Sequence, residues 1–394
     1  TGDTAKPAGY NTFVGVNAGN FVMGLTATKT YHGSYNSAMG SYALHYNTIG
    51  YYNSAMGSSA LFSNTTGYYN SAMGSSALYS NTTGFSNSAM GYSALYSNTT
   101  GFSNSAMGYF ALDSNNTGSF NSAMGSYALH SNTTGYYNSA MGSYALISNT
   151  TGYTNSAMGS YALYYNTTGY ENSAMGYSAL YYNSTGSNNS AIGYSALKSN
   201  TTGNYNIGIG YEAGKNITTG SRNIMIGINV NAPSATGDNQ LNIGNVIYGD
   251  LSSGNIGIGT PTPNRKLKVN GDAGGTTPWY NDSDARLKTN VQTISNALEK
   301  VEKMRGVSFT WIDTENHPKG QHIGFIAQEL KEVLPEVVDK KGEYYSVQES
   351  SITAVLVEAI KEQQKQIEKQ QKQIERQQKQ IEDLKAQIKT LKHQ

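Results

Sequence analysis

The sequence predicts a mostly β protein, in which stacked parallel β-roll or β-helix coils with a 17-residue period precede a small α+β domain and a C-terminal coiled coil. Three observations predict this fold. A five-residue motif recurs at a fixed period, charged residues become denser near Ser283, and isoleucines recur every seven positions near the C-terminus. A single compact domain is not expected of 394 residues, because globular cores stop growing at roughly 250–300 residues.

The repeated motif is Asn-Ser-Ala-Met-Gly, with related motifs in its last three copies. The twelve copies begin at Asn36, Asn53, Asn70, Asn87, Asn104, Asn121, Asn138, Asn155, Asn172, Asn189, Asn206 and Asn223. The spacing between copies never changes, and Ala43, Leu44, Asn47 and Gly50 recur at the same offsets in the following copies. A fixed period of this kind indicates a stacked architecture.

Each copy is expected to form one strand and one turn. Isoleucine alternates with glycine at 206–210, as in a strand with two different faces. By alignment we expect Met39 to point into the coil, and Ala38 and Gly40 to lie on the outer side, where another chain approaches. The Asn-Thr-Thr-Gly segment predicts a turn whose glycine takes a positive φ. At about 4.8 Å per strand, twelve coils span roughly 58 Å.

The charge distribution divides the chain near residue 283. Residues 1–282 carry 8 Lys/Arg and 8 Asp/Glu, whereas residues 283–394 carry 18 and 17. A net charge of +1 gives no electrostatic reason to expect a nucleic acid or an anionic membrane as partner. No apolar run approaches the roughly 20 residues of a membrane span, and the absence of cysteine excludes disulfides.

Five regions are expected along the chain. They are N-terminal cap coils at 1–30, a shaft of 17-residue β repeats at 31–227, a β neck at 228–282, a small α+β domain at 283–359, and a coiled coil at 360–394.

The shaft has little of the chemistry that an enzyme or a metal site needs. Between residues 31 and 205 its only acidic side chains are Asp113 and Glu171, more than three coils apart. One chain therefore cannot supply the paired carboxylates of a glycoside hydrolase. A repeated aspartate, as in calcium-binding rolls, is absent as well. No cofactor and no metal are expected.

Tyrosines gather in the shaft, for example at Tyr51 and Tyr52 and at Tyr136 and Tyr137. One interpretation is that they form stacked ladders that stabilise neighbouring coils or contacts between chains. The other is that they form an outer face that binds a cell-surface glycan or receptor. The sequence leaves both interpretations open.

The C-terminal segment carries an apolar heptad repeat. Its first positions are Ile360, Ile367, Ile374, Ile381 and Ile388. This spacing places them on one seam of a coiled coil and makes them the expected association residues. Their partner positions are Gln363, Gln370, Gln377, Leu384 and Leu391, and buried glutamines weaken a coil but can fix its register. A solvated single helix is the alternative, and the heptads do not distinguish two strands from three.

The shaft motifs resemble two families. Asn-Ser-Ala-Met-Gly and Asn-Ser-Ala-Ile-Gly are similar to the strand motif of trimeric autotransporter adhesin heads, which are left-handed parallel β-rolls with a shorter period. Arrays with the same period as this chain, ending in segments such as 254–259 and 266–271, occur in phage-type tail fibre proteins. The resemblance implies a trimeric extracellular fibre.

The C-terminal region resembles the intramolecular chaperone of phage endosialidase tailspikes, which recurs in the myelin regulatory factor. The motifs are Ser-Asp-Ala-Arg-Leu-Lys at 283–288, His-Ile-Gly-Phe-Ile-Ala-Gln-Glu-Leu at 322–330 and Leu-Pro-Glu-Val-Val at 334–338. The resemblance implies a homotrimer, assistance in folding the preceding β structure, and self-cleavage by a serine and a lysine, which match Ser283 and Lys288.

Cleavage is expected at the Asp282–Ser283 bond, because a serine hydroxyl reaches the preceding carbonyl through a five-membered ring. Lys288 would have to be desolvated to act as the base. The alternative role of Ser283 is to cap a nearby helix. Any enzymatic activity is at most this single turnover on the chain itself.

Two functions fit these features. The first is a tail fibre of a phage or a phage-derived injection device, placed on a virion and in contact with a cell surface. The second is a bacterial surface adhesin or structural filament with the same shaft.

Overall fold

The computed structural model describes residues 9–20, 23–271, 273, 282–313, 317, 319–341 and 343–391. Parts of the expected cap coils and neck, and the last three residues of the expected coiled coil, lie outside these residues. The chain divides into two compact units, Thr1–Val269 and Asn270–Gln394.

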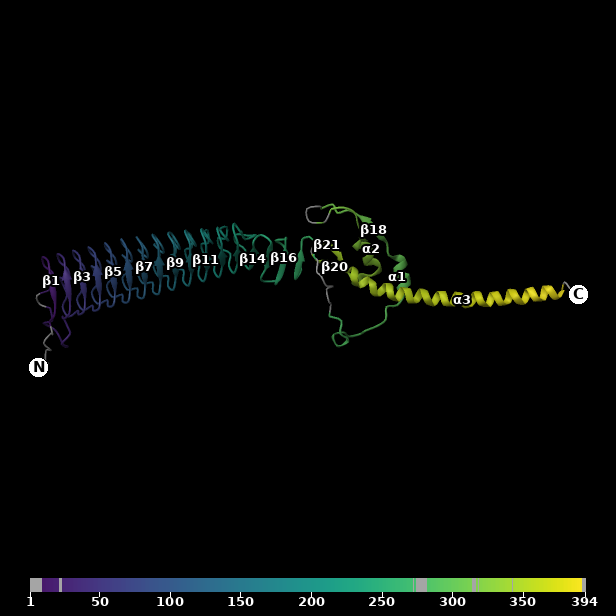
Figure 1. Ribbon diagram of the computed structural model, residues 1–394, viewed down its shortest axis with the longest axis horizontal. Helices are drawn as coiled ribbons and strands as arrows, with labels where there is room; N and C mark the ends of the chain where they lie inside the picture. Colours follow the sequence, from purple (N-terminus) through teal and green to yellow (C-terminus); the bar gives the residue numbers. More distant parts are fainter. Residues whose placement is uncertain are drawn as a thin grey trace. The chain divides into compact units, whose positions relative to one another are not determined.

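The first unit is a stack of coils, each with one three-residue strand (Figure 1). The strands are β1 (Thr12–Val14), β2 (Ser37–Met39), β3 (Ser54–Met56), β4 (Ser71–Met73), β5 (Ser88–Met90), β6 (Ser105–Met107), β7 (Ser122–Met124), β8 (Ser139–Met141), β9 (Ser156–Met158), β10 (Ser173–Met175), β11 (Ser190–Ile192), β12 (Ile207–Ile209) and β13 (Ile224–Ile226). From β2 onward each strand pairs in parallel with the equivalent residues of the next coil, as Ser105 does with Ser122. The predicted stack of parallel β coils is confirmed.

Four further strands end this unit. They are β14 (Gln240–Ile243), β15 (Ile247–Asp250), β16 (Asn255–Ile258) and β17 (Leu267–Val269). β14 continues the parallel stack on β13, whereas β15 pairs antiparallel with both β14 and β16. The regular coil therefore gives way to a short meander before the second unit.

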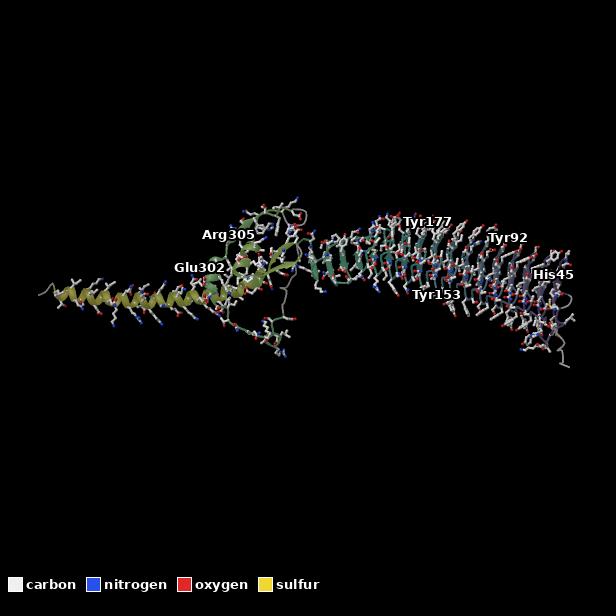
Figure 2. All side chains as sticks on the ribbon, turned by 180° about the vertical axis from the view of Figure 1, so that it is seen from behind. His45, Tyr92, Tyr153, Tyr177, Glu302 and Arg305 are labelled. Carbon is white, nitrogen blue, oxygen red and sulfur yellow. The ribbon has the colours of Figure 1, made fainter. Side chains whose placement is uncertain are left out.

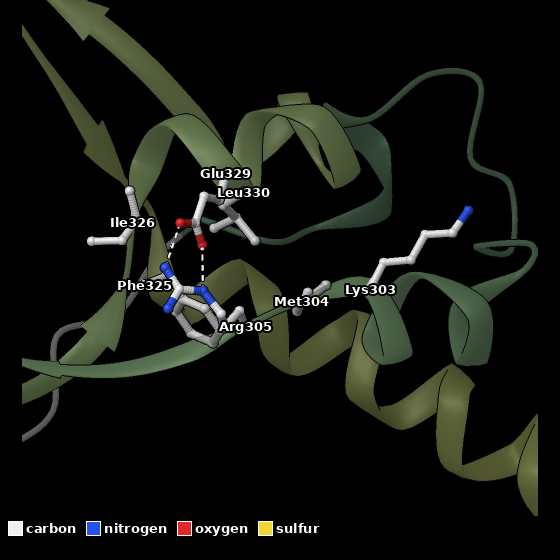
Figure 3. Close-up of a pocket in the computed structure, with 7 residues that line it drawn as sticks. All are labelled: Lys303, Met304, Arg305, Phe325, Ile326, Glu329 and Leu330. Carbon is white, nitrogen blue, oxygen red and sulfur yellow. Dashed lines mark hydrogen bonds and ion pairs between the residues drawn. The ribbon is translucent and has the colours of Figure 1, made fainter.

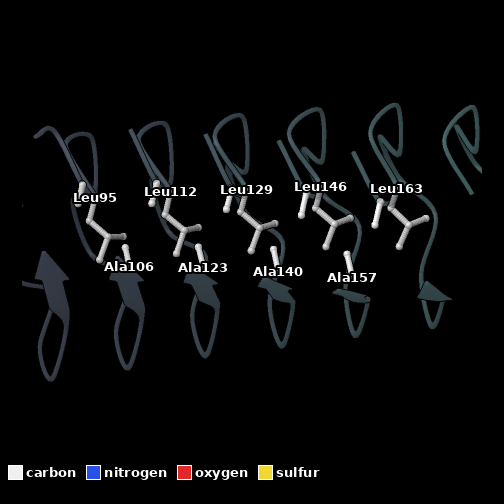
Figure 4. Close-up of a cluster of buried hydrophobic side chains, with 14 of the residues drawn as sticks. Leu95, Ala106, Leu112, Ala123, Leu129, Ala140, Leu146, Ala157 and Leu163 are labelled. Carbon is white, nitrogen blue, oxygen red and sulfur yellow. The ribbon is translucent and has the colours of Figure 1, made fainter. Parts of the chain in front are cut away.

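In the coils of β2 to β11 the interior is filled by two alanines and one leucine. In the coil of β6 these are Ala106, Ala111 and Leu112, all fully or almost fully buried, and the set repeats along the stack (Figure 4). Met107, in contrast, is 45% exposed. The prediction that methionine points into the coil and alanine away from it is wrong. In the coils of β2 to β11 the leucine and the second alanine already fill this interior, so only a methyl group fits beneath the strand. Where Gly214 replaces the leucine, the buried Met225 of β13 takes the place of the alanine.

Two ladders of buried asparagines hold the coils in register. In the first, the Asn121 side-chain amide donates to Asn104 Oδ1 at 3.2 Å and to the Gly135 carbonyl at 2.8 Å. In the second, Asn115 donates to Asn98 Oδ1 at 2.8 Å and to the Gly118 carbonyl at 2.9 Å. Among the described residues, every buried side-chain nitrogen or oxygen has a hydrogen-bond partner. These ladders therefore avoid the cost of burying unpaired amides.

The glycine with a positive φ is in the strand motif, where Gly108 has φ 144°. The prediction that the turn glycine adopts this conformation is wrong, because Gly118 is absent from the residues with positive φ. Gly118 is required for a different reason. A Cβ there would lie 2.3 Å from Asn115 Oδ1 and 2.4 Å from the Gly135 carbonyl oxygen.

The second unit is a small α+β fold that continues into a long helix. Its elements are η1 (Ala285–Leu287), α1 (Ala297–Lys303), β18 (Gly306–Phe309), β19 (His322–Phe325), α2 (Ala327–Val333), η2 (Pro335–Val337), β20 (Val338–Lys341), β21 (Tyr344–Val347), η3 (Glu349–Ser351) and α3 (Ile352–Leu391). β18 and β19 form one antiparallel hairpin, and β20 and β21 form another. Each pair forms a separate two-stranded sheet.

The core of this unit joins its helices. The buried residues are Ala297, Leu330, Leu334, Val337, Ile352, Val355 and Ala359. Only the first turns of α3 thus pack against α1 and α2. Beyond Ala359, the described part of α3 buries none of its side chains within the chain.

Candidate self-cleavage site

Ser283 and Lys288 lie on either side of the single turn of η1 (Ala285–Leu287). This turn folds the chain back, so that Lys288 Nζ donates a hydrogen bond to Ser283 Oγ at 2.7 Å. The two residues that the sequence pairs are therefore adjacent in space. A lysine nitrogen at this distance can exchange a proton with the hydroxyl.

The cap of η1 is Asp284. Its carboxylate accepts from the Arg286 backbone N–H at 2.8 Å and from Arg286 Nη2 at 2.7 Å. These hydrogen bonds hold the pKa of Asp284 below its usual range and raise the pKa of Arg286. The capping role considered for Ser283 thus falls to its neighbour, which leaves the serine hydroxyl to Lys288.

Asp282, Ser283 and Lys288 are all exposed in the single chain. Lysine amines in water are protonated at neutral pH, and burial is the usual way to lower their pKa. The site therefore has its nucleophile and its candidate base in contact, but the single chain does not supply the burial that a lysine base requires.

An exposed ion pair, which the sequence analysis missed, joins the segment after α1 to α2. Arg305 Nε donates to Glu329 Oε2 at 3.0 Å, and the guanidinium also contacts Oε1 (Figure 3). Arg305 lowers the pKa of Glu329. The pocket beside this pair has a volume of about 10 Å³, which is too small for a substrate.

The long helix also supports α1 through a contact that the sequence analysis missed. The Glu362 carboxylate accepts from the backbone N–H groups of Ala297 at 3.1 Å and Leu298 at 2.9 Å. These hydrogen bonds lower the pKa of Glu362. An acid at a helix N-terminus is a common device. Here the acid comes from a distant helix, so no local pattern in the sequence indicates it.

The isoleucines expected to mediate association share one exposed row on α3. Their exposed fractions lie between 46% for Ile374 and 64% for Ile360, and Leu384 and Leu391 are exposed as well. The surrounding side chains of the helix are polar. Such a row on a polar helix is typical of the seam that becomes buried when helices associate in a coiled coil.

The shaft tyrosines form stacked rows along its surface. Tyr136 and Tyr153 stack at 5.0 Å between ring centroids, and Tyr153 and Tyr170 at 4.9 Å. Figure 2 shows Tyr92 and Tyr177 along one edge of the shaft and Tyr153 along the other. The rows also leave much ring surface exposed, 43% for Tyr136 and 48% for Tyr177. Stacking and an outer binding face are therefore compatible.

The comparisons with known proteins agree with the C-terminal geometry. Residues 283–339 match the family described as chaperone of endosialidase. The match begins at Ser283 itself and includes Lys288. The C-terminal unit thus contains a chaperone-of-endosialidase domain.

Curated relatives of the chain are long tail fibre proteins Gp37 of phages. Those of Enterobacteria phages K3 and T2 are each 43% identical over 91 residues, which is 21% of this chain and 7% of theirs. That of Enterobacteria phage M1 is 31% identical over 96 residues, 23% of this chain and 38% of its own. The chain thus spans less than half of the length of these relatives, from 7% to 38%. The predicted resemblance to phage tail fibre proteins with a C-terminal chaperone domain is confirmed.

No helix among the described residues is long and apolar enough to cross a membrane. No group of three His, Asp or Glu side chains in the same part of the chain is placed to hold a metal ion.

Proposed function

We propose that this chain forms a trimeric tail fibre of a phage or phage-derived particle, and that its C-terminal domain guides assembly and then cuts the chain between Asp282 and Ser283. The observation that carries the proposal is the 2.7 Å contact between Lys288 Nζ and Ser283 Oγ, at the first residue of the match to the chaperone family. The similarity to long tail fibre proteins supports the placement on a virion tail.

The reaction begins when Ser283 Oγ attacks the carbonyl carbon of Asp282 through a five-membered ring. Lys288, as a neutral amine, takes the hydroxyl proton. The peptide C–N bond breaks, the serine nitrogen receives a proton, and an ester joins Asp282 to Ser283 Oγ. Water hydrolyses the ester. The products are a shaft ending in the Asp282 carboxylate and a released domain with a free amine at Ser283.

Assembly supplies the missing activation of the lysine. The dyad is exposed in one chain, whereas contact among three chains would remove Lys288 from water and favour its neutral form. Cleavage would then follow only from correct association. The exposed isoleucine row of α3 supports such association. Loss of the chaperone would make unfolding of the shaft irreversible, because the unfolded chain could no longer refold readily, so the lifetime of the fibre would depend on its rate of unfolding.

The test is mass spectrometry of freshly expressed full-length protein. We expect the wild-type chain to appear as two fragments that meet at Asp282–Ser283, and Ser283→Ala and Lys288→Ala to remain intact. Arg286→Ala is the matched control, because it removes a neighbouring positively charged side chain whose hydrogen-bond partner is Asp284 rather than Ser283. This control should be cut.

The outcomes separate the parts of the proposal. An uncut wild-type trimer contradicts self-cleavage and leaves the chaperone role standing. Cleavage of Lys288→Ala at the wild-type rate contradicts the assignment of the base.

We also propose that the exposed tyrosine rows of the shaft contact the cell surface. The rings present flat apolar faces with hydroxyl groups at their edges, and this combination suits both glycans and protein receptors. The row of Tyr136, Tyr153 and Tyr170 supports this role, because Tyr136 and Tyr170 are exposed while the three rings stack.

A further inference from the structure

One face of the shaft carries an exposed apolar residue in every coil, and no described residue of the first unit covers it. It consists of the first and third residues of the strands β2 to β13, which point away from the buried alanines. We call it the methionine face. The third residues are Met39, Met56, Met73, Met90, Met107, Met124, Met141, Met158, Met175, Ile192, Ile209 and Ile226.

The composition of this face is uniform. The first residue is serine in ten strands and then Ile207 and Ile224, so no residue of the face is charged. The nine methionines are between 44% and 53% exposed. At the N-terminal end the face is hollowed into an open groove of about 440 Å³, lined by Val14, Met39, Met56 and their neighbours.

An apolar stripe of this length is unusual for a surface in water. At about 4.8 Å per coil the twelve strands span roughly 58 Å, and soluble monomers rarely expose a continuous apolar stripe of this length. Stripes of this kind mark interaction surfaces. The remaining question is which partner fits it.

The regular repeat of the methionine face indicates which kind of partner fits it. Nine successive coils carry serine and methionine without a change, whereas the tyrosine rows change from coil to coil, as Phe102, Ser119 and Tyr136 show at one offset. A globular receptor would contact only a few steps of a ladder this long. A partner that matches every step needs the same spacing of roughly 4.8 Å per coil, and another copy of this chain has it.

We propose that the methionine face is the surface on which copies of this chain pack against one another along the shaft. The proposal rests on the trimer proposed above and names the face that joins its shafts. Methionine suits this place, because its flexible apolar side chain fills the gaps between three converging ladders. The Tyr136 row, which is at a different offset of the coil, then stays available to the cell surface.

The absence of cysteine from the chain allows a direct test. Met107→Cys places one thiol on the methionine face, and Thr100→Cys places one in an exposed turn of the neighbouring coil, outside that face. The full-length proteins are oxidised with copper phenanthroline and run on denaturing gels without reductant. We expect Met107→Cys to form covalent dimers within its trimers at a yield at least tenfold above that of Thr100→Cys.

Light scattering before oxidation gives the oligomeric state of each protein, which is needed to interpret the cross-linking yield. An oligomer in which Met107→Cys links no better than Thr100→Cys contradicts the face assignment alone. A wild-type chain that is monomeric contradicts the proposed trimer as well. Met141→Cys, two coils further along, repeats the measurement if Met107→Cys does not fold, and it must give the same preference.

Discussion

Asp113 is a charged side chain within a row that is otherwise largely aromatic. At this offset of the coil, Phe62, Tyr79 and Tyr96 stack at 4.8 and 5.0 Å. Asp113 follows and faces His130 of the next coil, with Oδ2 3.9 Å from Nε2. Burial raises the pKa of Asp113, and the nearby His130 and the hydrogen bond to Ser114 lower it only in part. The shaft therefore keeps a partly buried acid at a cost.

The raised pKa of Asp113 predicts that the stability of the shaft depends on pH. Because the folded state raises the pKa of Asp113 above its ordinary value of 3.8, ionisation weakens the fold as pH rises through that raised pKa, and the penalty is complete above it. We expect Asp113→Asn to raise the melting temperature of the shaft at pH 7 by about 2–4 °C, the shift that roughly 1 kcal/mol produces in a domain of this size. At pH 3 the gain should vanish.

Thermal melts followed by circular dichroism check this expectation. Glu171→Gln is the matched control, since Glu171 is another acid of the shaft and is exposed. A stabilisation by Asp113→Asn that is as large at pH 3 as at pH 7 would exclude the proposed electrostatic cause.

The residues of the candidate site were predictable for a definite reason. Ser283 and Lys288 are close in sequence and match a family motif, so one turn of η1 is enough to join them. Glu362 was not predictable, because it reaches α1 from 65 residues away. The conformation of Leu112 was not predictable either. Its φ of 52° is uncommon for leucine, and nothing in the residue type indicates it.

Within a coil, a strict period in the sequence predicts that the coils stack, but it does not determine which side chains point inward. Strand alternation separates Ala106 from Met107, and hydrophobicity alone favours the methionine as the buried one. The coil reverses this choice, because Ala111 and Leu112 already occupy its narrow interior. Asparagine ladders at fixed offsets were visible in the sequence, but their burial follows only from the close packing of one coil on the next.

The tyrosine rows offer a test at the same scale, because serine replaces tyrosine at equivalent offsets. Ser119 and Ser187 occupy the offset of Tyr153 in other coils, so Tyr153→Ser is compatible with the fold. We expect it to cost about 1–2 kcal/mol of stacking with Tyr136 and Tyr170 and to weaken cell binding severalfold. The measurement is flow cytometry of labelled fibre on cells that bind the wild type.

Thr134→Ser is the control for this test, because it changes an exposed turn residue outside the tyrosine row. Unchanged cell binding by Tyr153→Ser, with the variant still folded, would contradict a role of this row in surface contact and would leave stacking as its purpose.

The two units of the molecule are stabilised in different ways. The shaft gains its order from repeated hydrogen bonds between coils and carries few charges, whereas the C-terminal unit is charged and has a small core shared by three helices. Long stacks of parallel β pairings fold slowly, because chain entropy is lost before the pairings form. In the proposed assembly, a C-terminal domain that first brings three chains together would lower the entropic cost of starting the stack, and it would no longer be needed once the stack has formed.

If assembly activates the dyad, a substitution far from Ser283 must affect cleavage. Ile374→Glu places three like charges at the centre of the exposed row on α3, so we expect it to weaken association of the full-length chain at least tenfold, or about 1.4 kcal/mol. Because fewer chains would then bury Lys288, the fraction of cut chain should fall with it. Ala386→Glu is the matched control, since it introduces the same charge on the same helix outside the isoleucine row and should preserve both association and cutting. Sedimentation and mass spectrometry of the same samples give the two quantities together. If Ile374→Glu abolishes the trimer while cleavage continues at the wild-type rate, the dyad works within one chain and its activation must come from that chain alone.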